Sequence, residues 1–135
     1  MFDLASIEAR DQFVLHLERP DTGEKIFADA KQTKPVTITV YGPGSEQHKR
    51  AISALQNRTL KRQAKGNKNV TAEVIREDQL ELMVALSADS ENLSFNGNPI
   101  KTADDFRNLY SNEKYKWVRD QVDAAVSDFA NFLTQ

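Results

Sequence analysis

The chain has 135 residues, of which 39% are apolar and 28% are charged, a balance typical of one globular domain spanning residues 1–135. It contains no cysteine, which excludes disulfides, zinc–thiolate sites and cysteine nucleophiles. The net charge of −2 gives the whole molecule no strong attraction to nucleic acid or anionic lipid. No apolar run is long enough for a membrane helix, and the first residues lack the features of a signal peptide. We therefore expect a soluble protein without a membrane partner, which stays in the compartment where it is made.

Residues 1–41 are predicted to be the β-rich part of the domain. Apolar and polar side chains alternate over residues 12–18, which predicts a half-buried strand. A Pro-Asp-Thr-Gly turn follows, and residues 25–28 are predicted to return as a second strand. Residues 36–41 are mostly β-branched and predict a third strand. We expect these three strands to form a small antiparallel sheet.

Residues 45–135 are predicted to be mainly helical. Ser45 follows the turn Gly42-Pro43-Gly44 and is a suitable N-cap for a helix over residues 46–64. The apolar stripe of this helix is narrow. A polar loop at residues 65–69 precedes a second helix, which is predicted to begin near Thr71 and to run to about Ser87.

The rest of the chain is predicted to contain a hairpin and two more helices. Asn96-Gly97 lies between short apolar flanks and indicates a two-residue hairpin turn. Thr102 and Asp105 have the spacing of a capping box and open a short helix. A last helix is predicted over residues 113–133. The fold class is therefore α+β, a small antiparallel sheet of about three strands followed by about four helices.

No constellation of residues predicts catalysis, metal binding or a cofactor. The two histidines, His16 and His48, have no acidic residue spaced to form a site with them. The glycine-rich turn at residues 41–45 lacks the Gly-Lys-Ser/Thr ending of a phosphate-binding loop, and Pro43 removes a backbone donor. A strand-to-helix connection is the simpler interpretation. We expect a protein that is not an enzyme and that binds other protein.

Positive charge is concentrated in one segment, which contains no acidic residue between Gln47 and Ala72. It can be a solvated helix face, a surface for an acidic protein or for a second copy, or a site for a nucleic-acid backbone. Nucleic acid is the least favoured because no aromatic side chain lies between Tyr41 and Phe95 to stack on bases. The segment carries Lys49, Arg50, Arg58, Lys61, Arg62, Lys65 and Lys68, the first five of which are candidate partner-binding residues.

The predicted C-terminal helix has a wide apolar face rich in aromatic residues. A wide face on a terminal helix can bury one side in its own domain and offer the rest to a partner. The candidate partner-binding residues on this helix are Tyr115, Trp117, Val118, Val122, Phe129 and Phe132.

Two passages resemble the tail assembly chaperones of long-tailed, siphovirus-type bacteriophages and prophages. The first, at residues 37–45, reads TITVYGPGS and is followed by a helix with basic residues. The second reads LYSNEKYKWVRDQVD at residues 109–123 and DFANFL at residues 128–133. The two passages stand in the order expected for that family.

The resemblance implies a non-enzymatic assembly factor in the cytoplasm of a host bacterium. Members of that family bind the tape measure protein, keep it soluble until tail tube subunits polymerise around it, and are not expected in the mature virion. In many of them a frameshifted longer form recruits the tail tube protein. The family also implies a homo-oligomer.

Two other functions remain open from the sequence. A structural tail component, such as a terminator or connector, would be retained in the virion. A small nucleic-acid-binding regulator would use the basic segment at residues 49–68, and its affinity would fall steeply with salt.

Overall fold

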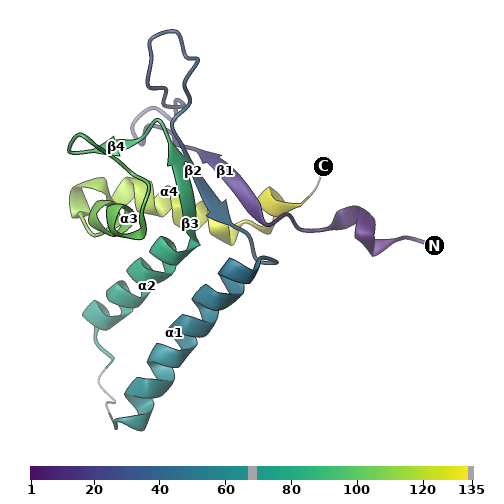
Figure 1. The fold of residues 1–135 in the computed structure, drawn as a ribbon, viewed down its shortest axis with the longest axis vertical. Helices are drawn as coiled ribbons and strands as arrows, with labels where there is room; N and C mark the ends of the chain where they lie inside the picture. The colour runs from purple at the N-terminus through teal and green to yellow at the C-terminus, as the bar shows by residue number, and fades with distance from the viewer. Residues whose placement is uncertain (67–69, 134–135) are drawn as a thin grey trace.

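A computed structural model describes residues 1–66 and 70–133 of the chain. Within these residues the fold is α+β, with a three-stranded antiparallel sheet and four α-helices, as predicted (Figure 1). The predicted loop at residues 65–69 and the basic Lys68 lie partly or wholly outside the described residues.

The sheet has the order β1-β2-β3, with β2 at its centre. β1 is Gln12–His16, β2 is Thr37–Tyr41 and β3 is Ser87–Glu91. Both pairings are antiparallel, with Phe13 opposite Val40 and Thr39 opposite Asp89. The alternation predicted for the first strand is confirmed, because Phe13, Leu15 and Leu17 point inward while Val14 is exposed.

The third strand of the sheet is not the one predicted from the sequence. Residues 25–28 do not form a strand. The segment makes isolated bridges, Glu18 with Lys25 and Phe27 with Pro35, and backbone hydrogen bonds such as the one that the Ile26 amide donates to the Leu17 carbonyl. β3 instead follows directly after the second helix, at residues for which the sequence predicted no strand. Its residues, Ser-Ala-Asp-Ser-Glu, have low strand propensity and no apolar alternation. Pairing with β2, about fifty residues earlier in the chain, gives them their conformation.

The first two helices form an antiparallel hairpin that projects from the body of the molecule (Figure 1). α1 spans Glu46–Ala64, and the Ser45 side chain accepts a hydrogen bond from the His48 amide at its start. α2 spans Ala72–Leu86, and Thr71 caps it in the same way. Both predicted helix starts are confirmed.

The predicted small hairpin and the capping box are also present. β4 (Ser94–Phe95) pairs with β5 (Asn98–Pro99), and Asn96 and Gly97 both have positive φ, as a two-residue type I′ turn requires. α3 spans Ala103–Tyr110, and Thr102 and Asp105 each accept a hydrogen bond from the other's backbone amide.

The single helix predicted over residues 113–133 is wrong in its extent. The structure has a 3₁₀ turn η2 at Glu113–Tyr115, then α4 at Lys116–Ser127, then a second 3₁₀ turn η3 at Phe129–Phe132. The helix ends at Asp128, whose backbone is extended and whose side chain accepts a hydrogen bond from the Ala130 amide. This break allows the Phe132 ring to enter the core beside Phe13, with 6.0 Å between ring centroids.

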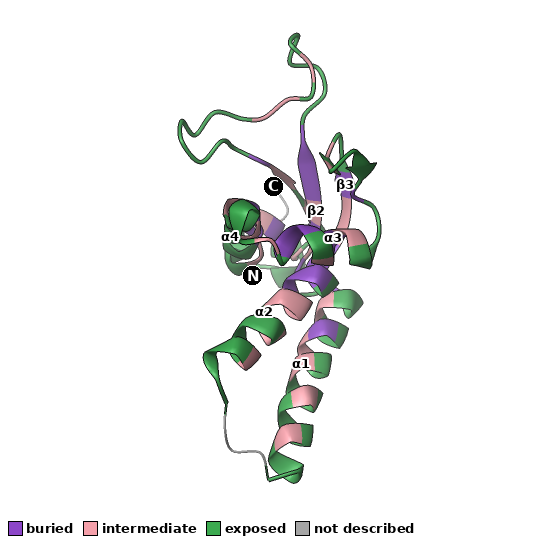
Figure 2. Ribbon diagram, turned by 90° about the vertical axis from the view of Figure 1, so that its left-hand side faces the viewer, coloured by how far each residue is buried: buried purple, intermediate pink, exposed green. Residues whose placement is uncertain are grey.

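The core lies where α2, α3, α4 and η3 meet the sheet. α4 packs against β2, whose Ile38 and Val40 are fully buried. Figure 2 shows burial concentrated in the body and in the part of the α1–α2 hairpin next to it, while the far end of the hairpin is exposed.

Candidate partner-binding surfaces

Half of the C-terminal partner-binding residues predicted from the sequence belong to the core of the monomer. The exposed fraction is 3% for Val118 and 0% for both Val122 and Phe132. Their apolar stripe faces β2 and Phe13 rather than solvent. A surface that includes these three side chains is therefore not available in the folded chain.

The other three, Tyr115, Trp117 and Phe129, do not form one continuous surface. The Tyr115 ring packs edge-on against Phe95, with ring centroids 5.1 Å apart. Trp117 is half-buried and lines a shallow cavity together with Ile26 and the turn that follows Arg19. Phe129 is exposed beyond the other end of α4. The wide face predicted for this helix is divided between core packing and separate contacts.

The predicted basic surface is also divided, because two of its arginines bind an acid of the neighbouring helix. Asp78 on α2 accepts hydrogen bonds from Arg62 at 2.6 and 2.8 Å and from Arg58 at 3.3 Å. These guanidinium groups, Arg62 first, hold the pKa of Asp78 below its ordinary value. Arg58 and Arg62 therefore join α1 to α2, and the one carboxylate of Asp78 offsets part of their combined charge.

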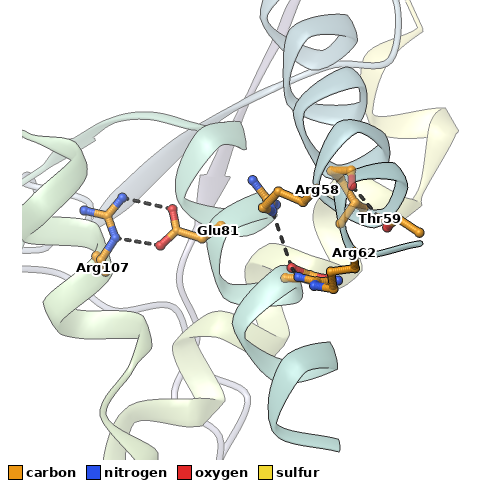
Figure 3. A network of polar contacts seen from close by, with 7 residues as sticks. Arg58, Thr59, Arg62, Glu81 and Arg107 are labelled. Atoms are coloured by element: carbon orange, nitrogen blue, oxygen red, sulfur yellow. Dashed lines mark hydrogen bonds and ion pairs between the residues drawn. The ribbon is translucent and has the colours of Figure 1, made fainter. Parts of the chain in front are cut away.

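A second ion pair continues this network to α3. Arg107 donates two hydrogen bonds to Glu81, at 2.7 and 3.0 Å, and a third to Asp104. The hydrogen bonds from Arg107 lower the pKa of Glu81. Figure 3 shows Arg107 on one side of α2 and the two α1 arginines on the other. The acids of α2 thus connect three helices.

Three of the predicted basic residues remain accessible on α1. Lys49, Arg50 and Lys61 are exposed and have no ion pair in the described part of the chain. This leaves fewer uncompensated cations than the sequence indicated, which weakens the case for binding a nucleic-acid backbone.

A groove with a volume of about 430 Å³ lies between α1, α2 and α3. Most of its surface is apolar, and Arg50 and Lys101 are the charged residues of its lining. The Lys101 ammonium already contacts Asp89, Glu91 and the Ser90 carbonyl. The residues that define the groove include Tyr41, Arg50, Ala54, Val84, Lys101 and Phe106.

Apart from Tyr115 and Phe129, most of the large exposed apolar side chains lie on two projecting segments, and those on the segments are not in the predicted set. The first segment, the N-terminal arm, comprises residues 1–8 and carries Phe2, Leu4 and Ile7, each more than half exposed. The second segment is the far end of the α1–α2 hairpin. Leu60, Val70 and Ile75 are exposed there by 60%, 60% and 52%. The narrow stripe of the first helix was the one sequence signal that could have pointed to the hairpin.

No cluster of three or more potential metal ligands occurs among residues 1–66 and 70–133. Within the same residues, no helix combines the length and the apolar character needed to cross a membrane. Comparison with known proteins gives no match to a protein-family model and no significant match to a curated protein or a solved structure.

Proposed function

We propose that this protein is a non-enzymatic tail assembly chaperone of a long-tailed bacteriophage or prophage. It binds the tape measure protein in the cytoplasm of the host, keeps it soluble, and leaves before the virion is complete. The resemblance at residues 37–45, 109–123 and 128–133 supports the family, and the exposed apolar end of the α1–α2 hairpin supports the binding role. The tail tube protein is the second proposed partner, contacted through a longer form of the chain.

The observation that carries the proposal is the uncovered apolar surface on the hairpin. Of the 19 residues of α1, only Ala51 is buried. Leu60 on α1 and Ile75 on α2 lie toward the same far end, because the two helices are antiparallel and joined there. A helical client can pack its apolar stripe against such a pair, as helices do in a bundle.

The surface around these side chains suits a holdase. Lys61 follows Leu60 and is exposed without an ion pair among the described residues, so the complex keeps charge at its surface. Each copy offers only a few apolar side chains, which limits the affinity of a single contact. Many copies along one long client would add their contacts by avidity and could still be displaced one by one.

The test is co-expression with the tape measure protein of the same phage or prophage. We expect the chain to raise the soluble fraction of the tape measure protein and to co-purify with it. The double substitution Leu60→Ser with Ile75→Ser should abolish most of this effect. Val14→Ser is the matched control, because Val14 is equally exposed but lies on β1, away from the hairpin.

Two results would contradict the proposal. One is an unchanged soluble fraction of the tape measure protein when the wild-type chain is present at high level. The other is abundant peptides of this chain in mass spectra of purified mature virions, which would favour a structural tail component.

A further inference from the structure

β1 is an edge strand of the sheet, and its outer edge carries backbone groups that have no hydrogen-bond partner among the described residues (Figure 1). Just before β1, the Asp11 carbonyl accepts a hydrogen bond from the Gly42 amide. Just after it, the Leu17 amide donates one to the Val36 carbonyl, so the odd-numbered residues of this segment face β2. Because the direction alternates along an antiparallel strand, the residues between them point their amides and carbonyls outward. These outward residues are Gln12, Val14 and His16.

Contacts within the chain bound this free stretch at both ends. At one end the Arg10 amide donates a hydrogen bond to the Phe132 carbonyl. At the other end the Gln121 side chain binds both backbone groups of Glu18, at 2.9 Å to the amide and 2.7 Å to the carbonyl. The part of the edge that can accept another strand is therefore residues 12–16.

The opposite edge of the sheet is protected, whereas that of β1 is not. Folded proteins block an exposed strand edge with charged side chains, proline or a bulge. On β3, Asp89 and Glu91 are charged, and the Lys101 ammonium binds both of them and the Ser90 carbonyl. Residues 12–16 contain no lysine, acid or proline, and their pairing with β2 has no bulge. The sequence and the pairing thus leave β1 open to a further strand.

The free stretch is complementary to itself. If two β1 strands run antiparallel with Val14 opposite Val14, Gln12 of each copy comes opposite His16 of the other. Every outward amide then faces an outward carbonyl, as in a regular antiparallel ladder. Any other antiparallel register leaves at least one of these three residues without a free partner, because Arg10 and Glu18 are already bound.

The charges at the two ends of the stretch also match in this register. Arg10 of one copy comes opposite Glu18 of the other, and a two-fold axis makes this contact twice. Neither has an ion pair among the described residues. The Arg10 guanidinium donates a hydrogen bond to the Asn131 carbonyl, and Glu18 forms an isolated bridge with Lys25 that includes no ion pair. No two like charges come opposite each other within residues 10–18.

We infer that two copies of this chain join edge to edge through β1, with Val14 opposite Val14, so that their sheets form one continuous antiparallel sheet. Main-chain hydrogen bonds provide most of the contact, as in other cases of strand addition. The inference does not depend on the proposed function. It does not use the client surface on the hairpin, and its test contains no client, so the two can fail separately.

The first experiment tests the register by cross-linking the full chain, which contains no cysteine of its own. Opposite residues of a hydrogen-bonded antiparallel pair have Cα atoms about 5.5 Å apart, which a disulfide can span. Under mild oxidation, Val14→Cys should therefore give a disulfide-linked dimer in high yield. Gln12→Cys is the matched control on the same strand. Its two copies would lie four residues out of register, roughly 13 Å apart, and should cross-link at a much lower yield.

The second experiment measures self-association by sedimentation velocity over a range of concentrations. Val14→Pro removes an amide that faces away from β2, a position where an edge strand tolerates proline, and should weaken association at least about tenfold. Val14→Ser keeps this amide and should weaken association no more than about fivefold. Ala103→Pro is the control for the proline itself, because Ala103 is the first residue of α3, where proline is also tolerated.

Circular dichroism checks that Val14→Pro is folded, and the cross-linking experiment does not depend on that variant. Three results would overturn the inference. The wild-type chain could remain monomeric at all concentrations. Val14→Cys could cross-link no better than Gln12→Cys. A folded Val14→Pro chain could associate as strongly as the wild type, which would show that the outer edge of β1 is not the contact.

Discussion

The C-terminal helix α4 and the α1–α2 hairpin use their apolar residues in opposite ways. α4 has 12 residues, and Val118, Val122 and Ala125 are all buried. α1 has 19 residues, and only Ala51 is buried. The apolar stripe of α4 is therefore buried in the core, while the α1–α2 hairpin, whose first helix has a narrower stripe, leaves Leu60 and Ile75 exposed. An apolar face predicts burial, and only the neighbours of that face decide whether its own chain or a partner covers it.

The largest expected effect contrasts two phenylalanines three residues apart in η3. Phe132→Ala removes a fully buried ring that packs against Phe13, so it should cost about 3–5 kcal/mol of unfolding free energy. Phe129 is 54% exposed, and Phe129→Ala should cost less than about 1 kcal/mol. Urea denaturation followed by circular dichroism measures both. Equal losses would show that Phe129 is also part of the core.

The next largest effect is expected at Gly42, in the turn that connects β2 to α1. A Cβ on Gly42 would lie 2.6 Å from both the Arg10 carbonyl oxygen and a ring carbon of Phe132. Gly42→Ala should therefore destabilise the fold by about 1–3 kcal/mol through overpacking. Gly44→Ala is the control, because its nearest contact would be 3.9 Å away. Similar stabilities of the two variants would contradict this tight contact between the turn and η3.

A smaller loss of stability is expected when the ion pairs between α1 and α2 are removed. Asp78→Asn removes the carboxylate that binds Arg58 and Arg62, and should cost on the order of 1 kcal/mol at pH 7. The native pKa of Asp78 lies below its unfolded value of about 3.9. Its contribution is therefore complete well above pH 4 and is lost as the pH falls through the native pKa.

The measurement for Asp78 is the stability difference between wild type and variant at several pH values. The difference should be constant near neutral pH and should narrow below about pH 4. Asp123→Asn on α4 makes the same change in net charge, has no ion pair among the described residues and should cost less. If the stability difference between wild type and Asp78→Asn widened at low pH, it would contradict a native pKa of Asp78 below the unfolded value.

The smallest effect on stability is expected at the far end of the hairpin. Leu60→Ser should change the unfolding free energy by no more than about 0.5 kcal/mol, because the side chain is already 60% exposed. A loss of client binding without a loss of stability would then separate this surface from the core. A destabilisation as large as that of Phe132→Ala would remove the contrast between the two regions.

Local chemistry was sufficient to determine many parts of this fold from the sequence. The caps at Ser45 and Thr71, the capping box at Thr102 and the turn at Asn96-Gly97 all formed as predicted. Each depends on hydrogen bonds or dihedral angles within about four residues. The α+β class and two of the three sheet strands followed from periodicity in the same way.

Only the tertiary structure decided the third strand, the break in the last helix and the location of the exposed apolar surface. β3 is a strand because β2 pairs with it, and α4 ends at Asp128 because Phe132 fits beside Phe13. Tertiary contacts also decided which of the predicted partner-binding residues are buried. Periodicity placed Val118 and Val122 on an apolar face, but the sheet that buries them comes from distant parts of the chain. Contacts between residues far apart in sequence leave no local pattern from which they could be predicted.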